Sequence, residues 1–180
     1  MTAAKAGKRL VLLRHAKSAW PDMPDHERPL ALRGQRNAPV MGGWLRTEGL
    51  VPDLVVCSSA RRARETWQLV QAGLGATPPV RYDEGVYQAS AVQLLALIRR
   101  QPETVTTLLI VGHDPGVPGL AVTLSGAGSA PDRTLGRMRA KFPTAAIAVF
   151  TCTGSWGALS PGSARLASFI TPRDLAGPLR

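Results

Sequence analysis

Three short, uninterrupted apolar runs constrain the fold of this chain more than any other feature of its sequence. They are Leu10 to Leu13, Leu54 to Cys57 and Leu108 to Val111. Aliphatic runs of this length are typical of strands that are buried on both faces. Because helices must cover both faces of such a sheet, the runs predict an α/β fold with parallel strands.

Helical segments alternate with these predicted strands. We expect helices at about 32–48, 60–72, 91–100 and 117–124, and a short strand at 80–82. In the third helix, Val92, Leu95 and Ile98 would share the buried face, and Ser90 would cap the N-terminus. Late strands at 145–151 and 165–170, with Trp156 to Leu159 as a candidate third, predict a hairpin-rich end of the sheet.

Side chains suited to an anion follow each of the three apolar runs. Arg14 and His15 follow the first run, and His113 follows the third. After the second, Ser59 is expected to cap a helix whose first turn contains Arg62, beside free N–H groups and the positive end of the helix dipole. Taken alone, His15 has an alternative interpretation as a surface side chain. Open α/β sheets present ligand-facing groups at the carboxyl ends of their strands, so the three motifs together predict one crevice.

In combination and order, these motifs resemble those of the histidine phosphatase superfamily over most of the chain. The segments that match its two histidine motifs and its second arginine motif are Arg14-His15-Ala16, Val111 to Gly116 and Ser58 to Thr66. Ala16 stands where the family has glycine. Features similar to the small phosphohistidine phosphatases of the SixA type are Arg28-Pro29-Leu30, Arg33-Gly34 and Pro172 to Leu175.

The resemblance implies a three-layer α/β/α fold, with a mostly parallel central sheet and antiparallel C-terminal strands. It also implies a covalent phosphohistidine intermediate on His15 and a phosphate pocket formed by Arg14, Arg62 and His113. No metal and no cofactor are implied, and neither cysteine has the neighbours of a zinc site.

The chemistry of these residue types agrees with such roles. A histidine nucleophile must be unprotonated on one nitrogen, while a backbone carbonyl or a carboxylate holds the other. Arg14 and Arg62 would neutralise the phosphoryl oxygens. His113 would donate a hydrogen bond to the phosphoryl group, as imidazolium in a phosphate-bound site.

Further candidates have less specific signals. Glu84 is the candidate general acid, with Asp83 as its rival and an exposed loop carboxylate as the alternative interpretation. Lys17 and Ser18 follow the nucleophile and are possible phosphate-binding residues. They open a Pro-rich segment, 17–30, that predicts a loop over the site, in which His26 is expected to be solvated.

The composition limits the class of protein. The net charge is +10, from 22 basic and 12 acidic residues, but the chain has no basic–aromatic interleaving, zinc finger or helix-turn-helix signature. We therefore expect no nucleic acid partner. We also expect no membrane association, because no apolar stretch approaches the length of a span and the N-terminus lacks a signal peptide. Residues 1–8 predict a flexible tail, 9–180 a single domain, and Cys57 and Cys152 reduced core residues of a cytoplasmic protein.

A basic stripe forms if the segment near residue 137 is helical. Arg133, Arg137 and Lys141 recur every four residues. The other side of this segment carries Leu135, Met138 and Phe142. The stripe is either a solvated face or a surface that steers an acidic protein towards the site.

The function predicted from these observations is a phosphatase that forms a phosphohistidine intermediate, with phosphohistidine proteins as its substrates. The first alternative is a phosphatase or mutase that acts on a small phosphate ester. The second is a phosphate-binding module without catalysis. The complete His-Arg-His set argues against the second, because a binding module needs no nucleophile. The sequence does not predict an oligomeric state.

Overall fold

A computed structural model of the chain describes residues 7–129 and 132–177. The described residues form a six-stranded sheet with the strand order β3-β2-β4-β1-β5-β6. The strands are β1 (Lys8–Arg14), β2 (Leu54–Ser58), β3 (Val80–Asp83), β4 (Thr107–Gly112), β5 (Ile147–Cys152) and β6 (Ala164–Ile170). The first four are parallel to one another, β5 is antiparallel to β1, and β6 is antiparallel to β5.

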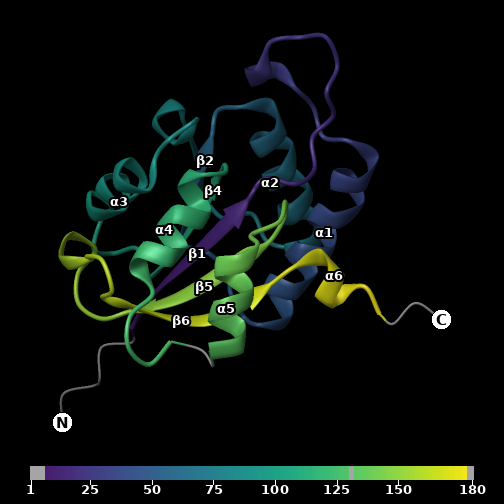
Figure 1. Cartoon of the computed structure of the whole chain (residues 1–180). Coiled ribbons are helices and arrows are strands. Elements are labelled where there is room, and N and C mark those ends of the chain that lie inside the picture. Colours follow the sequence, from purple (N-terminus) through teal and green to yellow (C-terminus); the bar gives the residue numbers. More distant parts are fainter. Residues whose placement is uncertain (1–6, 130–131, 178–180) are drawn as a thin grey trace.

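Helices cover both faces of the sheet (Figure 1). They are α1 (Leu32–Thr47), α2 (Arg61–Leu74), α3 (Ala91–Arg99), α4 (Gly116–Leu124), α5 (Asp132–Ala140) and α6 (Pro172–Leu175). Short 3-10 helices are η1 (Asp25–Glu27), η2 (Glu84–Val86) and η3 (Trp156–Ala158). One face packs against α1 and α2, and the other against α3, α4 and α5. The predicted three-layer α/β/α fold is confirmed.

Strand β1 separates two hydrophobic cores. Leu10 and Leu12 point into the core that includes α3, α4 and α5, and Val11 and Leu13 point into the core beneath α1 and α2. All four side chains are fully buried. This burial on both faces explains why the run carries no alternation of apolar and polar residues.

Cys57 and Cys152 lie in strands and are free and buried, as predicted. Burial raises the pKa of both thiols, that of Cys152 to about 12. No helix within the described ranges is long and apolar enough to cross a membrane.

Three local predictions were wrong. The N-cap position of α2 is Ala60 rather than Ser59, because the chain leaves β2 one residue later than expected. In α3, Leu95 and Ile98 are buried as predicted, but Val92 is 77% exposed, because Leu94 and Leu97 complete the buried side of the helix in its place. The segment from Trp156 forms η3 instead of a strand, and its indole Nε1 donates a hydrogen bond to the carbonyl of Val105 at 2.9 Å.

The N-terminal boundary also differs from the expected tail at 1–8. Lys8 is the first residue of β1 and is buried, with Nζ donating to the carbonyl oxygens of Glu103 and Val105. Residues 1–6 lie outside the described part of the chain.

Candidate active site

The register between β1 and β4 brings the two predicted site histidines together. Arg14 pairs with Gly112, so the next residue of each strand leaves the sheet at the same edge. The backbone N–H of His15 donates to the carbonyl of Gly112 at 2.9 Å. The rings of His15 and His113 have centroids 5.0 Å apart, and both residues are buried. Two motifs that lie far apart in the sequence thus form one site.

The neighbouring strand β2 adds a serine and an arginine. Its last residue is Ser58, whose Oγ lies 2.7 Å from Nε2 of His113. The chain then enters α2, and Arg62, in the first turn of that helix, is buried. Sequence reasoning assigned no role to Ser58, although it lies in the quoted motif.

The two histidines and Arg62 line a cavity of about 230 Å³. Four cationic side chains contribute to it: Arg14, Lys17, Arg28 and Arg62. Its other lining residues include His15, His113, Ser18, Trp20, Asp114 and Thr144. Every residue predicted for the site except Glu84 therefore lies at this cavity. Such a concentration of positive charge is suited to an anion.

The hydrogen bonds of His15 fix its tautomer. Its Nδ1 lies 2.7 Å from the carbonyl oxygen of Ala16, which can only accept, so Nδ1 carries the proton and Nε2 is left with a lone pair. Burial lowers the pKa of His15 to about 4, and the charges of Arg62 and Arg14 act in the same direction. The ring is therefore neutral near pH 7, as a nucleophile must be.

The position of Ala16 is itself fixed by α2. Its backbone N–H donates to Oγ1 of Thr66 at 2.9 Å, and that hydroxyl donates to the carbonyl of Arg62 at 2.6 Å. The carbonyl that orients His15 is thus tied to the helix that carries Arg62.

His113 is also neutral near pH 7. Burial lowers its pKa to about 3, and repulsion by His15 and Arg62 adds to the effect. Its Nδ1 is buried and has no hydrogen-bond partner among the described residues. The imidazolium form predicted for a phosphate-bound site remains a prediction, since a bound dianion would raise the pKa again.

A loop carboxylate that sequence reasoning missed holds Arg62 in place. The Asp25 side chain accepts from Arg62 Nη2 at 3.0 Å, from Arg28 Nη1 at 2.8 Å and from the Tyr87 hydroxyl at 2.7 Å. The Asp25 carbonyl also accepts from Arg62 Nη1 at 2.7 Å. These hydrogen bonds, that of Tyr87 first, hold the pKa of Asp25 well below its usual range. No local pattern marks Asp25, because its partners lie up to 62 residues away in the sequence.

Arg28 is a further arginine of the cavity. Its side chain is 7% exposed and donates to Oγ of Ser18 at 2.5 Å and to the carbonyl of Ala19 at 3.0 Å. The guanidinium carbon of Arg28 lies 3.2 Å from the centroid of the Trp20 ring, and Trp20 is 77% exposed. The motif Arg28-Pro29-Leu30 was the sequence signal for this residue.

Arg14 is held from the opposite side. Its Nη1 donates to the carbonyl of Phe142 at 2.6 Å, and its Nη2 forms an ion pair with Asp114 at 3.2 Å. Among the described residues, Asp114 is the one carboxylate that lines the cavity.

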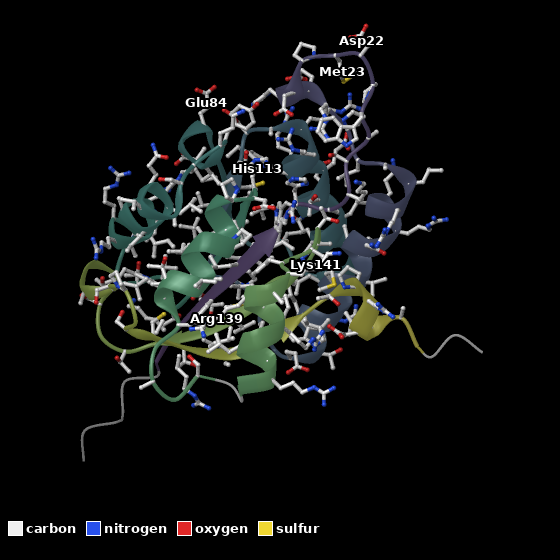
Figure 2. The ribbon with its side chains drawn as sticks, viewed as in Figure 1. Asp22, Met23, Glu84, His113, Arg139 and Lys141 are labelled. Atoms are coloured by element: carbon white, nitrogen blue, oxygen red, sulfur yellow. The ribbon has the colours of Figure 1, made fainter. Side chains whose placement is uncertain are left out.

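Glu84, predicted as the general acid, does not lie at the cavity. It opens η2 after β3, an edge strand of the sheet, and is exposed. Figure 2 shows it at the outer rim of the molecule, well apart from His113. Its rival Asp83 accepts from the N–H of Gly85 and lies 3.6 Å from Arg81, also outside the cavity.

His26 was expected to be solvated, but in the structure it contacts residues that surround the site. Its Nε2 lies 2.9 Å from Oγ of Ser59, and its ring packs edge-on against Tyr87. The same loop therefore supplies Asp25 to Arg62 and His26 to the segment before α2. Within the described ranges, no three His, Cys, Asp or Glu side chains gather into a group that could hold a metal ion.

Comparison with known proteins places these features in a family. Residues 10–90 match the family described as the histidine phosphatase superfamily (branch 1). The uncharacterized protein Rv1276c of Mycobacterium tuberculosis is 44% identical over 162 residues, which cover 89% of this chain and 100% of that protein.

Two solved structures have the same fold. One, described as "Putative Phosphohistidine Phosphatase SixA" from Nakamurella multipartitia, is 32% identical with a TM-score of 0.81, and the match covers 92% of this chain and 96% of that one. Another with the same description, from Agrobacterium tumefaciens, is 29% identical with a TM-score of 0.77, and covers 92% and 99%.

Proposed function

The chain belongs to branch 1 of the histidine phosphatase superfamily, and we propose that it is a metal-independent phosphatase that hydrolyses phosphohistidine in proteins through a covalent intermediate on His15. The observation that carries this proposal is the free Nε2 lone pair of a neutral, buried His15 inside a cavity lined by four cationic side chains. A cavity built only to bind phosphate has no need of an oriented nucleophile.

In the first step, Nε2 of His15 attacks phosphorus and the bond from phosphorus to the leaving nitrogen breaks. The substrate imidazole, protonated on its other nitrogen, leaves as the neutral ring, and His15, which keeps its proton on Nδ1, becomes a phosphorylated imidazolium. Arg14, Arg28 and Arg62 neutralise the phosphoryl oxygens, where charge redistributes in the transition state. The bound phosphoryl group raises the pKa of His113, so that its ring can donate a hydrogen bond. In the second step, water attacks the phosphorus on His15 and releases inorganic phosphate, which restores the neutral imidazole.

The size of the cavity favours a substrate that presents its phosphoryl group on a larger molecule. Its volume of about 230 Å³ lies below the range of roughly 300–1,000 Å³ of pockets that enclose small-molecule ligands. A phosphoryl group fits within this volume, and we infer that most of a larger substrate lies outside it.

The positions of the candidate acid–base groups also favour a phosphohistidine substrate. A ring nitrogen leaves more readily than an alkoxide, so a phosphoramidate needs a strong general acid less than an ester does. Glu84, the predicted acid, lies outside the cavity, and Asp114, the one carboxylate among the described residues that lines it, is paired with Arg14 and is therefore suited to accept a proton rather than to donate one. This arrangement suits a phosphohistidine better than an alkyl phosphate.

The test is a panel that contains a phosphohistidine protein, a sugar phosphate, a nucleotide and an aryl phosphate. We expect hydrolysis of the phosphohistidine protein and the aryl phosphate, and a phosphoenzyme that is labile in acid and stable in base. His15→Ala should lower turnover at least about a thousandfold and abolish the phosphoenzyme. Gln68→Ala, at an exposed side chain of α2 outside the cavity, is the control and should retain both.

Substantial turnover by His15→Ala would overturn the covalent mechanism. Preference for the sugar phosphate would return the function to a small-ester phosphatase or mutase. A wild-type chain that hydrolyses none of the four would favour a binding module.

A further inference from the structure

A second hollow lies beside the catalytic cavity, between the end of α5 and the start of α6. We call it the α5–α6 groove; it has a volume of about 400 Å³ and includes Arg33, Lys141 and Arg173 on its walls. Thr144 lines both this groove and the catalytic cavity, so the two are contiguous. Figure 2 shows Lys141 at the end of α5 that is nearer to His113.

The groove carries an excess of positive charge. Arg33, Arg137, Lys141 and Arg173 line it, and none of its lining residues is acidic. Arg137 is held by a two-oxygen ion pair with Asp174, at 2.7 and 2.8 Å. The other three are exposed and form no ion pair with any residue that the structure describes.

The basic stripe expected from the sequence is therefore divided in the structure. Met138 and Phe142 are buried, as the helical spacing predicts. Arg133 does not line the groove, and Arg137 is already paired, whereas Lys141 faces the groove just beyond the end of α5. Arg33 and Arg173 supply the other unpaired positive charges of the groove. They lie far from the stripe in the sequence, so its four-residue spacing could not predict them.

Helix α1 connects the groove with the nucleophile loop, the segment after β1 that carries His15 and Lys17. Gly34 packs so closely on this loop that a Cβ there would lie 2.3 Å from the carbonyl oxygen of Lys17. Arg33, which lines the groove, precedes Gly34, so α1 links the groove to the segment that carries Lys17 of the catalytic cavity. Positive charge thus extends from the cavity into the groove, and among the described residues Asp114, which is paired with Arg14, is the one acidic side chain that lines either of them.

We propose that the α5–α6 groove binds an acidic stretch of polypeptide that flanks the phosphorylated histidine of a protein substrate. This inference rests on the proposed function and names the part of the substrate that reaches beyond the cavity. Its charge is complementary to carboxylates, which would both steer the encounter and fix the register of the bound chain.

The lining favours a polypeptide over a nucleic acid. Besides the cations, Pro143, Phe169 and Pro172 contribute apolar surface to the groove. Phe169 is only 5% exposed, so it offers an apolar contact but no free ring face on which a base could stack. Aspartate and glutamate side chains can place their methylenes on this surface and their carboxylates near the cations.

The experiment compares two synthetic phosphohistidine peptides that differ only in their flanks. One carries four Asp or Glu residues and the other carries Asn or Gln at the same positions. At about 20 mM salt, we expect wild type to hydrolyse the acidic peptide with a kcat/KM about tenfold higher, and the preference to shrink at about 200 mM. Anisotropy of labelled peptides bound to His15→Ala should show the same difference in affinity.

The decisive variant is Arg33→Glu/Lys141→Glu. It should remove most of the preference for the acidic peptide and leave kcat/KM for an aryl phosphate within about twofold of wild type. The matched control, Arg36→Glu/Arg133→Glu, makes the same change in net charge on the same two helical regions but outside the groove, and should keep the preference. A peptide with lysine flanks should be hydrolysed faster by the groove variant than by wild type.

Equal hydrolysis of the two peptides by wild type would overturn the docking proposal, as would an equal loss in the control. Tighter binding of a single-stranded oligonucleotide than of the acidic peptide, lost in the groove variant, would assign the groove to nucleic acid instead. Turnover of aryl phosphate that depends on His15, without hydrolysis of either peptide, would remove the docking proposal and leave the phosphatase mechanism standing.

Discussion

The imidazole rings of His15 and His113 lie 5.0 Å apart at an interplanar angle of 52°, and burial keeps both uncharged. His15 follows the last residue of β1, and His113 follows the last residue of β4. Because these two strands pair directly, the sheet sets the separation of the rings. Because both rings are buried in a cavity lined by arginines, protonation of either ring lowers the free energy of unfolding. This cost can be measured.

We expect the free energy of unfolding to fall as the pH is lowered from about 6.5 to about 4. The pKa values of His15 and His113 are about 4 and about 3 in the folded chain and 6.5 in the unfolded chain, so the unfolded state binds more protons in that window. The loss for each buried ring is on the order of 2 kcal/mol at pH 5. Urea unfolding at pH 7 and pH 5 measures it, and His15→Asn/His113→Asn should flatten the dependence. Parallel losses in wild type and variant would contradict the assignment.

The loop carboxylate Asp25 is the basis of a second prediction. Asp25→Asn keeps the backbone contact with Arg62 but weakens the contacts of its side chain with Arg62 and Arg28. Because these contacts hold in place two arginines that we propose bind phosphate, we expect kcat/KM for an aryl phosphate to fall about tenfold, mostly through KM. Charge-assisted hydrogen bonds of this type are worth about 1.5–3 kcal/mol, which is consistent with that loss.

The matched control for this variant is Asp22→Asn. Asp22 is an exposed carboxylate of the same loop, and Figure 2 shows it at the outer end of that loop. It should leave kcat/KM unchanged. A lower KM in Asp25→Asn would mean that Asp25 competes with phosphate for the arginines instead of orienting them.

The parts of the fold that could be predicted from the sequence are those that depend on local pattern. Apolar runs identified the buried strands, and the residues at their ends identified His15, His113 and Arg62. Asp25 could not be found in this way, because its role arises only when the loop folds over α2. Glu84 was selected for following a strand, but β3 is an edge strand, and the residue after it leaves the sheet away from the central histidines. Neighbour relations within the sheet decide both cases, and a single sequence does not contain them.

Asp114 and Glu84 allow a direct comparison of two candidate acid–base groups. Asp114 lines the cavity and pairs with Arg14, so we expect it to take the proton from the water that attacks the phosphoenzyme. Asp114→Asn should lower kcat by about 10² and make the phosphoenzyme accumulate, as seen in a burst of product followed by slow turnover. Glu84→Gln should change the hydrolysis of aryl and alkyl phosphates little and equally. A selective loss with poor alcohol leaving groups in Glu84→Gln would restore Glu84 as the acid.

Two adjacent glycines of α1 give a test of the packing of α1 against α2. A Cβ at Gly42 would lie 2.0 Å from the carbonyl oxygen of Val70 in α2, whereas a Cβ at Gly43 meets nothing within 4 Å. Gly42→Ala must therefore push the two helices apart, and we expect it to lower the free energy of unfolding by about 1–3 kcal/mol or more. Gly43→Ala should raise it by up to about 1 kcal/mol, because alanine has the higher helix propensity. Urea unfolding of the two variants beside wild type checks both signs, and a stabilised Gly42→Ala would show that α1 and α2 are not in this close contact.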